Sequence, residues 1–243
     1  YVTAIRASQL GFKTAIVEKE SLGGVCLNWG CIPTKALLKS AQVFEYLKHA
    51  GDYGLSVKEY DKDFDAVVNR SRNVAAGMSK GVQFLMKKNE IDVLKGHGKI
   101  LSGKKVSVTQ NDKTQEYSAS NIIIATGARS RELPSLPQDG KKVIGYREAM
   151  TLPKQPKKII IVGSGAIGIE FAYFYNAMGS EVTIIEFQDR IVPIEDEEVS
   201  KQLERSFKKS GIIILTNAEV TGVDSKGKGV TASVKTLKGE EKL

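Results

Sequence analysis

The stretch Ile159-Ile160-Ile161-Val162-Gly163-Ser164-Gly165-Ala166-Ile167-Gly168 decides the fold class of this chain. Its four leading apolar residues predict a buried strand, and the glycines that follow have the spacing of a loop that turns from a strand into a helix. The first glycine permits a tight turn, the second lets a pyrophosphate approach the backbone, and the third lets helix and strand pack closely, with the helix N-terminus facing the anion. We therefore expect a dinucleotide to bind at Gly163, Gly165, Ala166, Ile167 and Gly168.

An acidic residue at the end of the next predicted strand, residues 182–185, strengthens this prediction. Glu186 lies 21 residues after Gly165 (186 − 165). A carboxylate there can accept hydrogen bonds from both hydroxyls of a ribose, and it repels a 2′-phosphate. The sequence therefore predicts NAD rather than NADP as the ligand. Two alternatives stay open, which are a glycine turn that serves packing alone and a strand-end carboxylate exposed to solvent.

The beginning of the chain repeats this pattern at a constant shift. Gly11 matches Gly179 (179 − 11 = 168), and Glu18 matches Glu186 (186 − 18 = 168). In each copy a predicted helix ends near the glycine, and a short apolar strand then leads to the acidic residue. The unchanged register predicts two βαβ halves. By analogy, Glu18 would hold the ribose of a first dinucleotide.

Between the two copies, hydrophobic periodicity predicts further helices and strands. The expected elements are a helix from Pro33 to about Gly51, a helix over 64–89, a small antiparallel β insertion over 91–118, a buried strand over 121–125 and a connecting segment over 129–157. Together with the repeat, these elements predict an α/β fold with two Rossmann-like dinucleotide-binding domains and a small antiparallel β insertion.

Composition excludes several classes of function. The chain has 36 Lys and Arg against 28 Asp and Glu, a net charge of +8, but its basic residues are scattered and no basic block is interleaved with aromatics. We therefore expect no nucleic-acid partner. The chain lacks a run of 18 apolar residues, so we expect no membrane span. Two cysteines are too few for a secreted disulfide scaffold.

Those two cysteines lie in the second informative stretch, residues 23–35. We expect Cys26 and Cys31 just before the helix that Pro33 opens, where the positive end of the helix stabilises a thiolate. Trp29 and Gly30 could let the chain fold back and close a disulfide across a short loop. Such a pair can carry two electrons between a thiol substrate and a cofactor. A zinc site and a purely structural disulfide stay open as alternatives, and we predict no metal.

The string CLNWGCIPTKALL, from Cys26 to Leu38, resembles the active-site segment of the flavin-dependent disulfide oxidoreductases. Its residues are closest to those of the members that oxidise protein-bound dihydrolipoyl groups, whereas glutathione and mercuric reductases typically have the sequence CVNVGC at this place. The resemblance covers the whole chain. It implies FAD and NAD as cofactors, with residues 1–142 as an FAD-binding domain and residues 143–243 as an NAD-binding domain.

The resemblance also implies roles for individual residues. Cys31 would lie beside the flavin and form a charge-transfer thiolate when reduced, and Cys26 would be the thiol that attacks the substrate. Lys35 would sit near the flavin N5 and pair with Glu170, which keeps the lysine charged. Further cofactor-binding residues that the resemblance implies are Glu18, Lys19, Gly24, Gly98, Thr126, Gly127, Ala128 and Val220.

What the resemblance implies about the intact protein is equally specific. Dihydrolipoyl groups would reduce the disulfide, and electrons would pass through FAD to NAD⁺. The implied partners are the lipoyl domain of a 2-oxo acid dehydrogenase acyltransferase and a second copy of the chain in a homodimer. The expected location is the bacterial cytoplasm, or the mitochondrial matrix or a plastid in a eukaryote. The rival interpretations are a sister reductase for another disulfide or metal ion, and a non-catalytic nucleotide-binding scaffold.

Parts of the family pattern are not found in the sequence. By the shift of 168, Gly168 corresponds to the position just before Tyr1, so we expect the first strand and glycine loop of the FAD domain to be missing. We also expect the C-terminal interface domain, with its His–Glu acid/base pair, and the last strands of the NAD domain to be missing. Residues 1–243 alone are therefore expected to be inactive.

Overall fold

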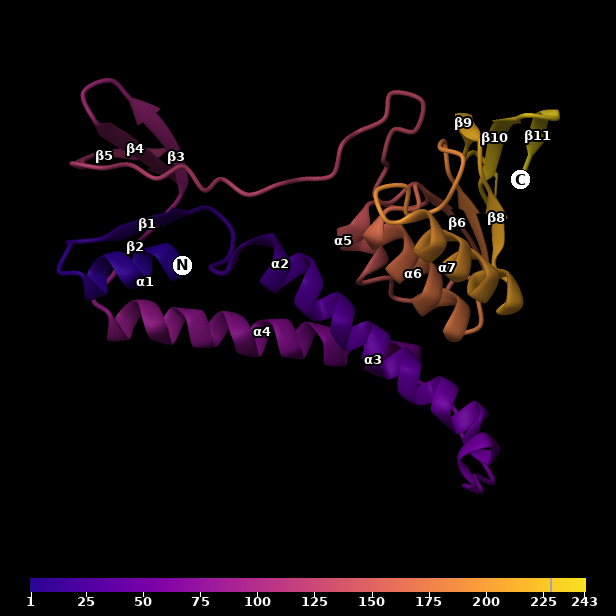
Figure 1. Cartoon of the computed structure of the whole chain (residues 1–243). Coiled ribbons are helices and arrows are strands. Elements are labelled where there is room, and N and C mark those ends of the chain that lie inside the picture. The colour runs from indigo at the N-terminus through magenta and orange to yellow at the C-terminus, as the bar shows by residue number, and fades with distance from the viewer. Residues whose placement is uncertain (228) are drawn as a thin grey trace. The chain divides into compact units, whose positions relative to one another are not determined.

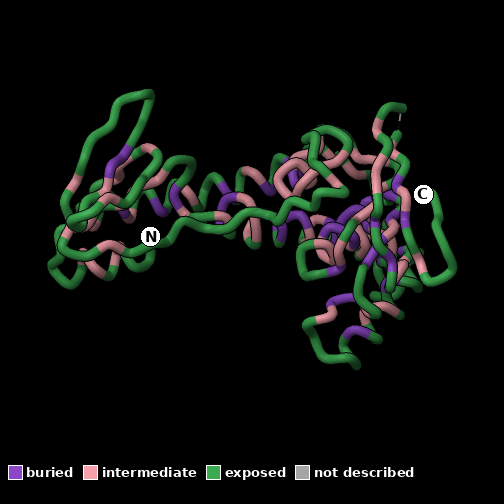
Figure 2. Tube along the Cα trace, turned by 90° about the horizontal axis from the view of Figure 1, so that it is seen from above, coloured by how far each residue is buried: buried purple, intermediate pink, exposed green. Residues whose placement is uncertain are grey.

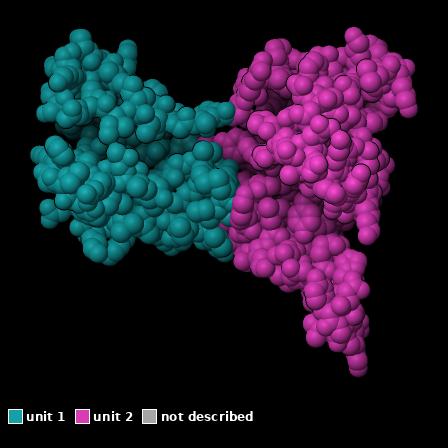
Figure 3. All heavy atoms as spheres, in the orientation of Figure 1, with its two compact units in different colours: residues 1–33, 72–129 teal, residues 34–71, 130–243 magenta. Residues whose placement is uncertain are grey.

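The computed structural model describes residues 1–227 and 229–243, which divide into two compact units (Figure 3). Unit 1 comprises residues 1–33 and 72–129, and unit 2 comprises residues 34–71 and 130–243. These units are defined by packing, whereas the predicted division at residue 142 concerns which nucleotide each part binds. That division stays a prediction. In the part of the chain that is described, no helix is both long and apolar enough to cross a bilayer.

Unit 1 combines a parallel strand pair with an antiparallel meander. Its elements are α1 (Val2–Gln9), β1 (Ala15–Glu18), α2 (Gly24–Trp29), β2 (Asp92–Lys95), β3 (His97–Leu101), β4 (Lys105–Gln110) and β5 (Lys113–Ser118), together with the start of α3 (Cys31–Lys48) and most of α4 (Phe64–Lys88). β1 pairs in parallel with β2, and β3, β4 and β5 pair antiparallel in that order. The core lies where Leu27 of α2 meets Val82 and Met86 of α4.

Unit 2 is built around a three-stranded parallel sheet. Its further elements are η1 (Ala50–Tyr53), α5 (Tyr146–Ala149), β6 (Lys158–Val162), α6 (Ala166–Ala177), β7 (Glu181–Ile185), α7 (Glu197–Lys209), β8 (Ile213–Leu215), β9 (Glu219–Asp224), β10 (Thr231–Thr236) and β11 (Gly239–Lys242). The parallel order is β6-β7-β8, and β9, β10 and β11 form an antiparallel meander. The helices α6 and α7 pack beside the parallel sheet (Figure 1). Phe171, Phe174 and Tyr175 make α6 the centre of this core.

The predicted repeat is confirmed element by element. α1 ends at Gln9 and α6 ends at Ala177, again 168 positions apart (177 − 9). Gly11 and Gly179 follow these helices with φ of 86° and 91°, the left-handed conformation that favours glycine. β1 then pairs in parallel with β2, as β7 pairs with β8. The α/β fold class is therefore correct.

The strand predicted over 121–125 is wrong. This segment is irregular, and Ile123 and Ile124 are each 70% exposed, in a long exposed stretch of the chain (Figure 2). Within residues 1–227 and 229–243 no strand pairs with it. An apolar run predicts burial but not a partner, and a strand without a partner leaves its backbone groups unpaired.

Two other boundaries differ from the prediction. The antiparallel insertion was expected over 91–118, but β2 pairs in parallel with β1 and so belongs to the nucleotide-fold sheet, leaving β3 to β5 as the insertion. The helix expected to open at Pro33 begins at Cys31 instead. Proline fits inside the first turn because the N–H groups there have no partner within the helix.

Candidate functional site

The two cysteines are joined in a disulfide, with their Cα atoms 4.7 Å apart. Cys26 lies in α2 and Cys31 is the first residue of α3, so the bond bridges two helices rather than preceding one as expected. Both residues are exposed. The zinc alternative needs two thiolates, and both sulfurs are used in the disulfide. Across the described residues, no three His, Cys, Asp or Glu side chains gather as metal ligands would.

The position of Cys31 favours its thiolate. α3 has 18 residues, and the described first turn carries no acidic side chain. The unpaired N–H groups at the start of a helix carry partial positive charge, which stabilises an anion at that end. When the disulfide is reduced, the electron pair that stays on Cys31 therefore meets a favourable potential.

Gly30 forms the sharp turn between the two helices. A Cβ atom built on Gly30 would lie 3.0 Å from the Cys26 Cα and 3.1 Å from the Val25 carbonyl oxygen. Those are backbone atoms, so a larger residue would force the end of α2 away from the start of α3. The expectation that Gly30 lets the chain fold back onto itself is confirmed.

Asn28 and Arg72 support this turn, and sequence reasoning missed both. The buried Asn28 amide donates from Nδ2 to the carbonyl oxygens of Leu22 and Gly24, each at 3.0 Å. The Arg72 guanidinium donates to the Asn28 carbonyl oxygen at 2.7 Å and lies 4.1 Å from the centre of the Trp29 ring. Burial lowers the pKa of Arg72. The feature of the sequence that could have identified Asn28 is its amide side chain inside a mostly apolar stretch.

We expect Asn28→Ala to lower the free energy of unfolding of the oxidised chain by about 1–3 kcal/mol, because the carbonyl oxygens of Leu22 and Gly24 lose a donor and the first of these bonds is buried. Urea denaturation monitored by circular dichroism measures this change. Asn69→Ala is the control, since Asn69 is exposed and its side-chain amide donates to Asp65 Oδ2 at 2.9 Å on the surface of α4. Its effect should stay within about 0.5 kcal/mol. Equal losses for the two variants would contradict the role given to Asn28.

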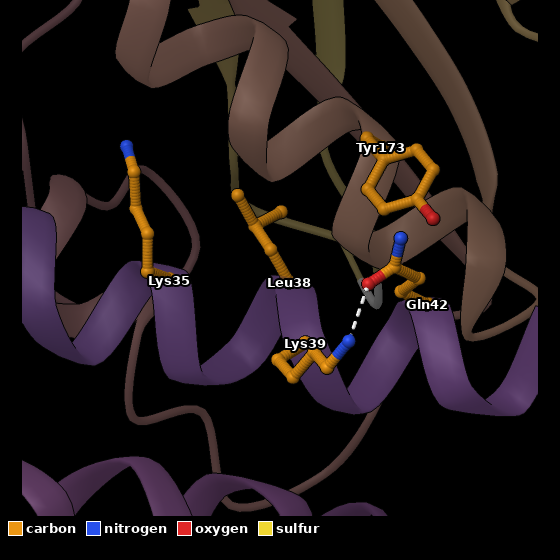
Figure 4. Close-up of a pocket in the computed structure, with 5 residues that line it drawn as sticks. All are labelled: Lys35, Leu38, Lys39, Gln42 and Tyr173. Carbon is orange, nitrogen blue, oxygen red and sulfur yellow. Dashed lines mark hydrogen bonds between the residues drawn. The ribbon is translucent and has the colours of Figure 1, made fainter.

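In unit 2, Lys35 of α3 and Glu170 of α6 form the predicted ion pair. A cavity of about 320 Å³ lies beside the pair, lined by Lys35, Leu38, Lys39, Gln42 and Tyr173 (Figure 4). Lys39 donates to Gln42 Oε1 at 2.9 Å on the same helix face. The side chain of Lys35 is 64% exposed, so its ammonium lies at the rim of the contact between α3 and α6 and not in the core.

The glycine loop shows the three roles expected from its spacing. Gly163 has φ of 95° and donates its amide to the Ile185 carbonyl oxygen at 2.8 Å, which closes the tight turn onto β7. A Cβ atom on Gly165 would meet nothing within 4 Å, so the approach to the backbone is open there. A Cβ atom on Gly168 would overlap the Gly163 carbonyl oxygen, which means that only glycine allows this contact. The loop therefore fits a pyrophosphate at the start of α6, where Ala166 and Ile167 form the first turn.

Glu186 is buried, with 6% exposure, so the alternative of an exposed strand-end carboxylate is wrong. Its Oε2 accepts from the Ser164 amide at 2.8 Å and the Ser164 hydroxyl at 2.6 Å, and its Oε1 accepts from the Gln188 amide at 2.8 Å. Burial by itself would raise the pKa of Glu186. The hydrogen bonds from Gln188, Ser164 and the Phe187 amide outweigh it, so the pKa lies below its ordinary value of 4.5.

This shift predicts a pH-dependent contribution to stability. Because the pKa of Glu186 is lowered in the folded chain, its contribution is present above about pH 4.5 and is lost as the pH falls through the folded-state pKa. We expect the stability gap between wild type and Glu186→Gln to be about 1–3 kcal/mol at pH 7 and to narrow below pH 4.5.

Urea denaturation between pH 3 and pH 7 measures that gap. Glu181→Gln is the control on the same strand, because Glu181 pairs with Lys158 on the surface at 2.8 Å, with side chains 72% and 77% exposed. Its gap should be small throughout. A Glu186→Gln gap that stays constant down to pH 3 would contradict the assignment.

The first copy keeps part of the same arrangement. Glu18 Oε1 accepts from the Glu20 amide at 2.7 Å, as Glu186 accepts from the residue two positions later. Arg129 pairs with Glu20 at 2.6 Å and so ties the end of the exposed segment Thr126–Ala128 to the turn after β1. Lys19 lies in that turn and is exposed, and Gly24 opens α2 with φ of 73°. Their predicted roles toward a cofactor stay predictions.

Gly98 and Val220 occupy corresponding places, each as the second residue of the first strand of a meander. A Cβ atom on Gly98 would lie 3.1 Å from Val17 Cγ1, which explains the glycine by close packing against β1. Val220 is buried in the core of the second meander, with 6% exposure. Their proposed contacts with adenine rings would come from the backbone, and these contacts also stay predictions.

Comparisons with known proteins are consistent with these observations. The family model described as pyridine nucleotide-disulphide oxidoreductase matches residues 1–243. A dihydrolipoyl dehydrogenase of Rhizobium etli is 47% identical over 256 residues, covering 99% of this chain and 53% of the relative. The mitochondrial dihydrolipoyl dehydrogenase of Pisum sativum is 39% identical over 244 residues, covering 99% and 49%.

A solved structure is also similar to this chain. The crystal structure of LpdA from Mycobacterium tuberculosis is similar with a TM-score of 0.89 and 26% identity, covering 99% of this chain and 53% of that one. The chain thus spans about half the length of the relatives it matches.

Proposed function

The chain belongs to the pyridine nucleotide-disulphide oxidoreductase family, and on that premise we propose that it carries the dithiol-oxidising and nucleotide-binding core of a dihydrolipoyl dehydrogenase. The proposed reaction oxidises a protein-bound dihydrolipoyl group through the Cys26–Cys31 disulfide and FAD, and passes hydride to NAD⁺. The observation that carries the proposal is the exposed disulfide whose second sulfur stands at the first residue of an 18-residue helix. Relatives at 39% and 47% identity that bear this enzyme name support the choice of substrate.

The cysteines account for the first half of the reaction in a balanced way. One thiolate of the dihydrolipoyl group attacks the Cys26 sulfur, the bond between Cys26 and Cys31 breaks, and Cys31 keeps the electron pair as a thiolate. The second thiolate of the substrate then attacks the lipoyl sulfur bonded to Cys26. The lipoyl disulfide leaves and Cys26 takes up one of the two substrate protons to become a thiol. The other proton is released to solvent, and two electrons remain on the chain. The start of α3 stabilises the Cys31 thiolate throughout.

The nucleotide sites fit the two proposed cofactors to different extents. For NAD, the open backbone at Gly165 and the tight packing at Gly168 leave room for a pyrophosphate, and Glu186 is held ionised for a ribose. For FAD, Glu18 repeats the hydrogen bond that Glu186 accepts from the residue two positions later. Bound FAD would supply an acceptor for the electron pair of the reduced cysteines, and bound NAD⁺ would supply the final hydride acceptor.

Lys35 and Glu170 take a supporting role in this proposal. A cation next to a flavin favours electron density on the ring, and Glu170 orients the Lys35 ammonium from α6. The proposed partners are the lipoyl domain of a 2-oxo acid dehydrogenase acyltransferase and a second copy of the chain. The proposed locations are a bacterial cytoplasm, the mitochondrial matrix or a plastid.

The half-reaction tests the proposal on residues 1–243 directly. A slight excess of dihydrolipoamide is added under anaerobic conditions. We expect two new thiols per chain and one molecule of lipoamide for each chain reduced, and mass spectrometry after alkylation counts both products. Reduced glutathione at the same thiol concentration is the control and should react far more slowly. Faster reduction by glutathione, together with tighter binding of NADPH than NADH, would assign the chain to a sister reductase instead.

A further inference from the structure

The glycine loop of unit 2 is hydrogen-bonded directly to the Glu186 carboxylate. Ser164 is completely buried, and it donates to Glu186 Oε2 from both its amide and its hydroxyl, at 2.8 and 2.6 Å. The Gln188 amide donates to Oε1 at 2.8 Å. Ser164 and Gln188 thus supply three donors to this carboxylate.

That number matters because a carboxylate has about four acceptor positions. The donors from Ser164 and Gln188 fill three of them, and the Phe187 amide, the weakest of the groups that lower the pKa of Glu186, is directed at the same carboxylate. At most one position remains. The ribose of the proposed NAD ligand brings two hydroxyl donors. One of the donors that the described residues supply must therefore leave when both ribose hydroxyls bind.

The Ser164 hydroxyl is the donor that can leave at least cost. The Ser164 amide is fixed by the loop, whose position is held further by the Val192 amide, which donates to the Ser164 carbonyl oxygen at 3.1 Å. The Gln188 amide is fixed in the turn after β7, where the Gln188 carbonyl oxygen accepts from the Asn217 amide at 2.8 Å. The hydroxyl needs only a rotation about χ1, between staggered positions that serine populates readily.

We propose that the Ser164 hydroxyl occupies, in the nucleotide-free chain, the acceptor position on Glu186 that one ribose hydroxyl takes, and that it rotates away when the nucleotide binds. This inference rests on the proposed NAD site. It makes Ser164 a positioning residue, because the hydroxyl keeps the buried carboxylate hydrogen-bonded until the ligand arrives. It also means that part of the binding energy of the nucleotide is used to displace the hydroxyl.

Removing the hydroxyl should therefore strengthen binding. We expect Ser164→Ala to bind NAD⁺ about tenfold more tightly, the equivalent of one charge-assisted hydrogen bond that no longer has to be broken. The same variant should unfold at a lower temperature without nucleotide. The 2′-deoxyadenosine analogue of NAD⁺ brings one hydroxyl and fits the open position, so its affinity should be the same for wild type and variant. Isothermal titration calorimetry on residues 1–243 measures all four affinities.

Ser180→Ala is the matched control. Ser180 is another buried serine of unit 2, with 3% exposure, and it directly precedes β7. Its hydroxyl donates to the Pro156 carbonyl oxygen at 2.6 Å. This control should lose stability and leave both affinities unchanged. If Ser164→Ala does not fold, Ser164→Gly also lacks the hydroxyl and gives the same comparison.

The outcomes separate this inference from the function on which it rests. Unchanged or weaker NAD⁺ binding by Ser164→Ala would overturn the inference, and so would an equal gain for NAD⁺ and the 2′-deoxy analogue. In both cases wild-type binding would leave the proposed NAD site intact. Failure of NAD⁺ to bind the wild type and Ser180→Ala alike would overturn the proposed site itself, and the inference with it.

Discussion

Cys31→Ser and Cys26→Ser are each expected to reduce electron uptake from dihydrolipoamide by about a thousandfold or more, because either change removes the bond that accepts the electron pair. Wild type should gain two thiols per chain on reduction, whereas each variant should begin with one thiol and gain none. Thiol counting before and after the dithiol measures this. Ser21→Ala, an exposed change in the segment before α2, is the control and should behave as wild type.

The same variants separate a redox disulfide from a structural one. Opening so short a loop costs at most about 2 kcal/mol of unfolding free energy by the chain-entropy estimate. A purely structural bond would predict that stability loss together with resistance of the wild-type disulfide to dihydrolipoamide. The lone Cys31 in Cys26→Ser should also react with a thiol probe in mildly acidic buffer faster than the lone Cys26 in Cys31→Ser, because Cys31 starts α3. Equal rates would contradict the role given to the helix.

The features that could be predicted from sequence are those fixed by nearby atoms. Gly163 and Gly168 were assigned a turn and a close contact, and both assignments follow from what a Cβ atom would meet within a few residues. The repeat was equally visible, because helix, glycine, strand and acid recur without a shift in register from Gly11 to Gly179. Local sterics and periodicity leave marks in sequence that need no knowledge of distant partners.

The features that were missed depend on partners far along the chain. Residues 121–125 have the apolar run of a buried strand, yet a strand also needs a neighbour, and the apolar run does not specify one. Arg72 supports the disulfide loop from α4, 44 residues after the Asn28 carbonyl that it bonds. Nothing in the segment around Arg72 marks it as different from other surface arginines.

The carboxylate of Glu186 lies between these two cases. Its position at the end of β7 followed from spacing, and the hydrogen bond from the Gln188 amide repeats that of Glu20 in the first copy. The identity and position of Glu186 could therefore be predicted from the sequence. Its burial, its hydrogen bonds to Ser164 and its lowered pKa depend on how the loop after β6 packs against the end of β7.

The glycine loop gives the second large effect, through two substitutions that look alike in sequence. Gly168→Ala should lower the free energy of unfolding by about 1–3 kcal/mol or more, because its methyl group would overlap the Gly163 carbonyl oxygen and lie 3.4 Å from Ile161 Cγ2. Gly165→Ala should leave stability nearly unchanged, since Gly165 has φ of −65° and open space around its Cβ position.

Both variants should nevertheless lose NAD⁺ affinity by about a hundredfold, a change of about 3 kcal/mol. In Gly168→Ala the loop is displaced, and in Gly165→Ala the methyl group occupies the space that the pyrophosphate approaches. Calorimetry and urea denaturation on the same samples measure the two quantities. Gly77→Ala in α4 is the control, where open space predicts a gain of about 0.5–1 kcal/mol in stability and unchanged binding. Undiminished NAD⁺ binding by Gly165→Ala would place the nucleotide elsewhere and contradict the role of this loop.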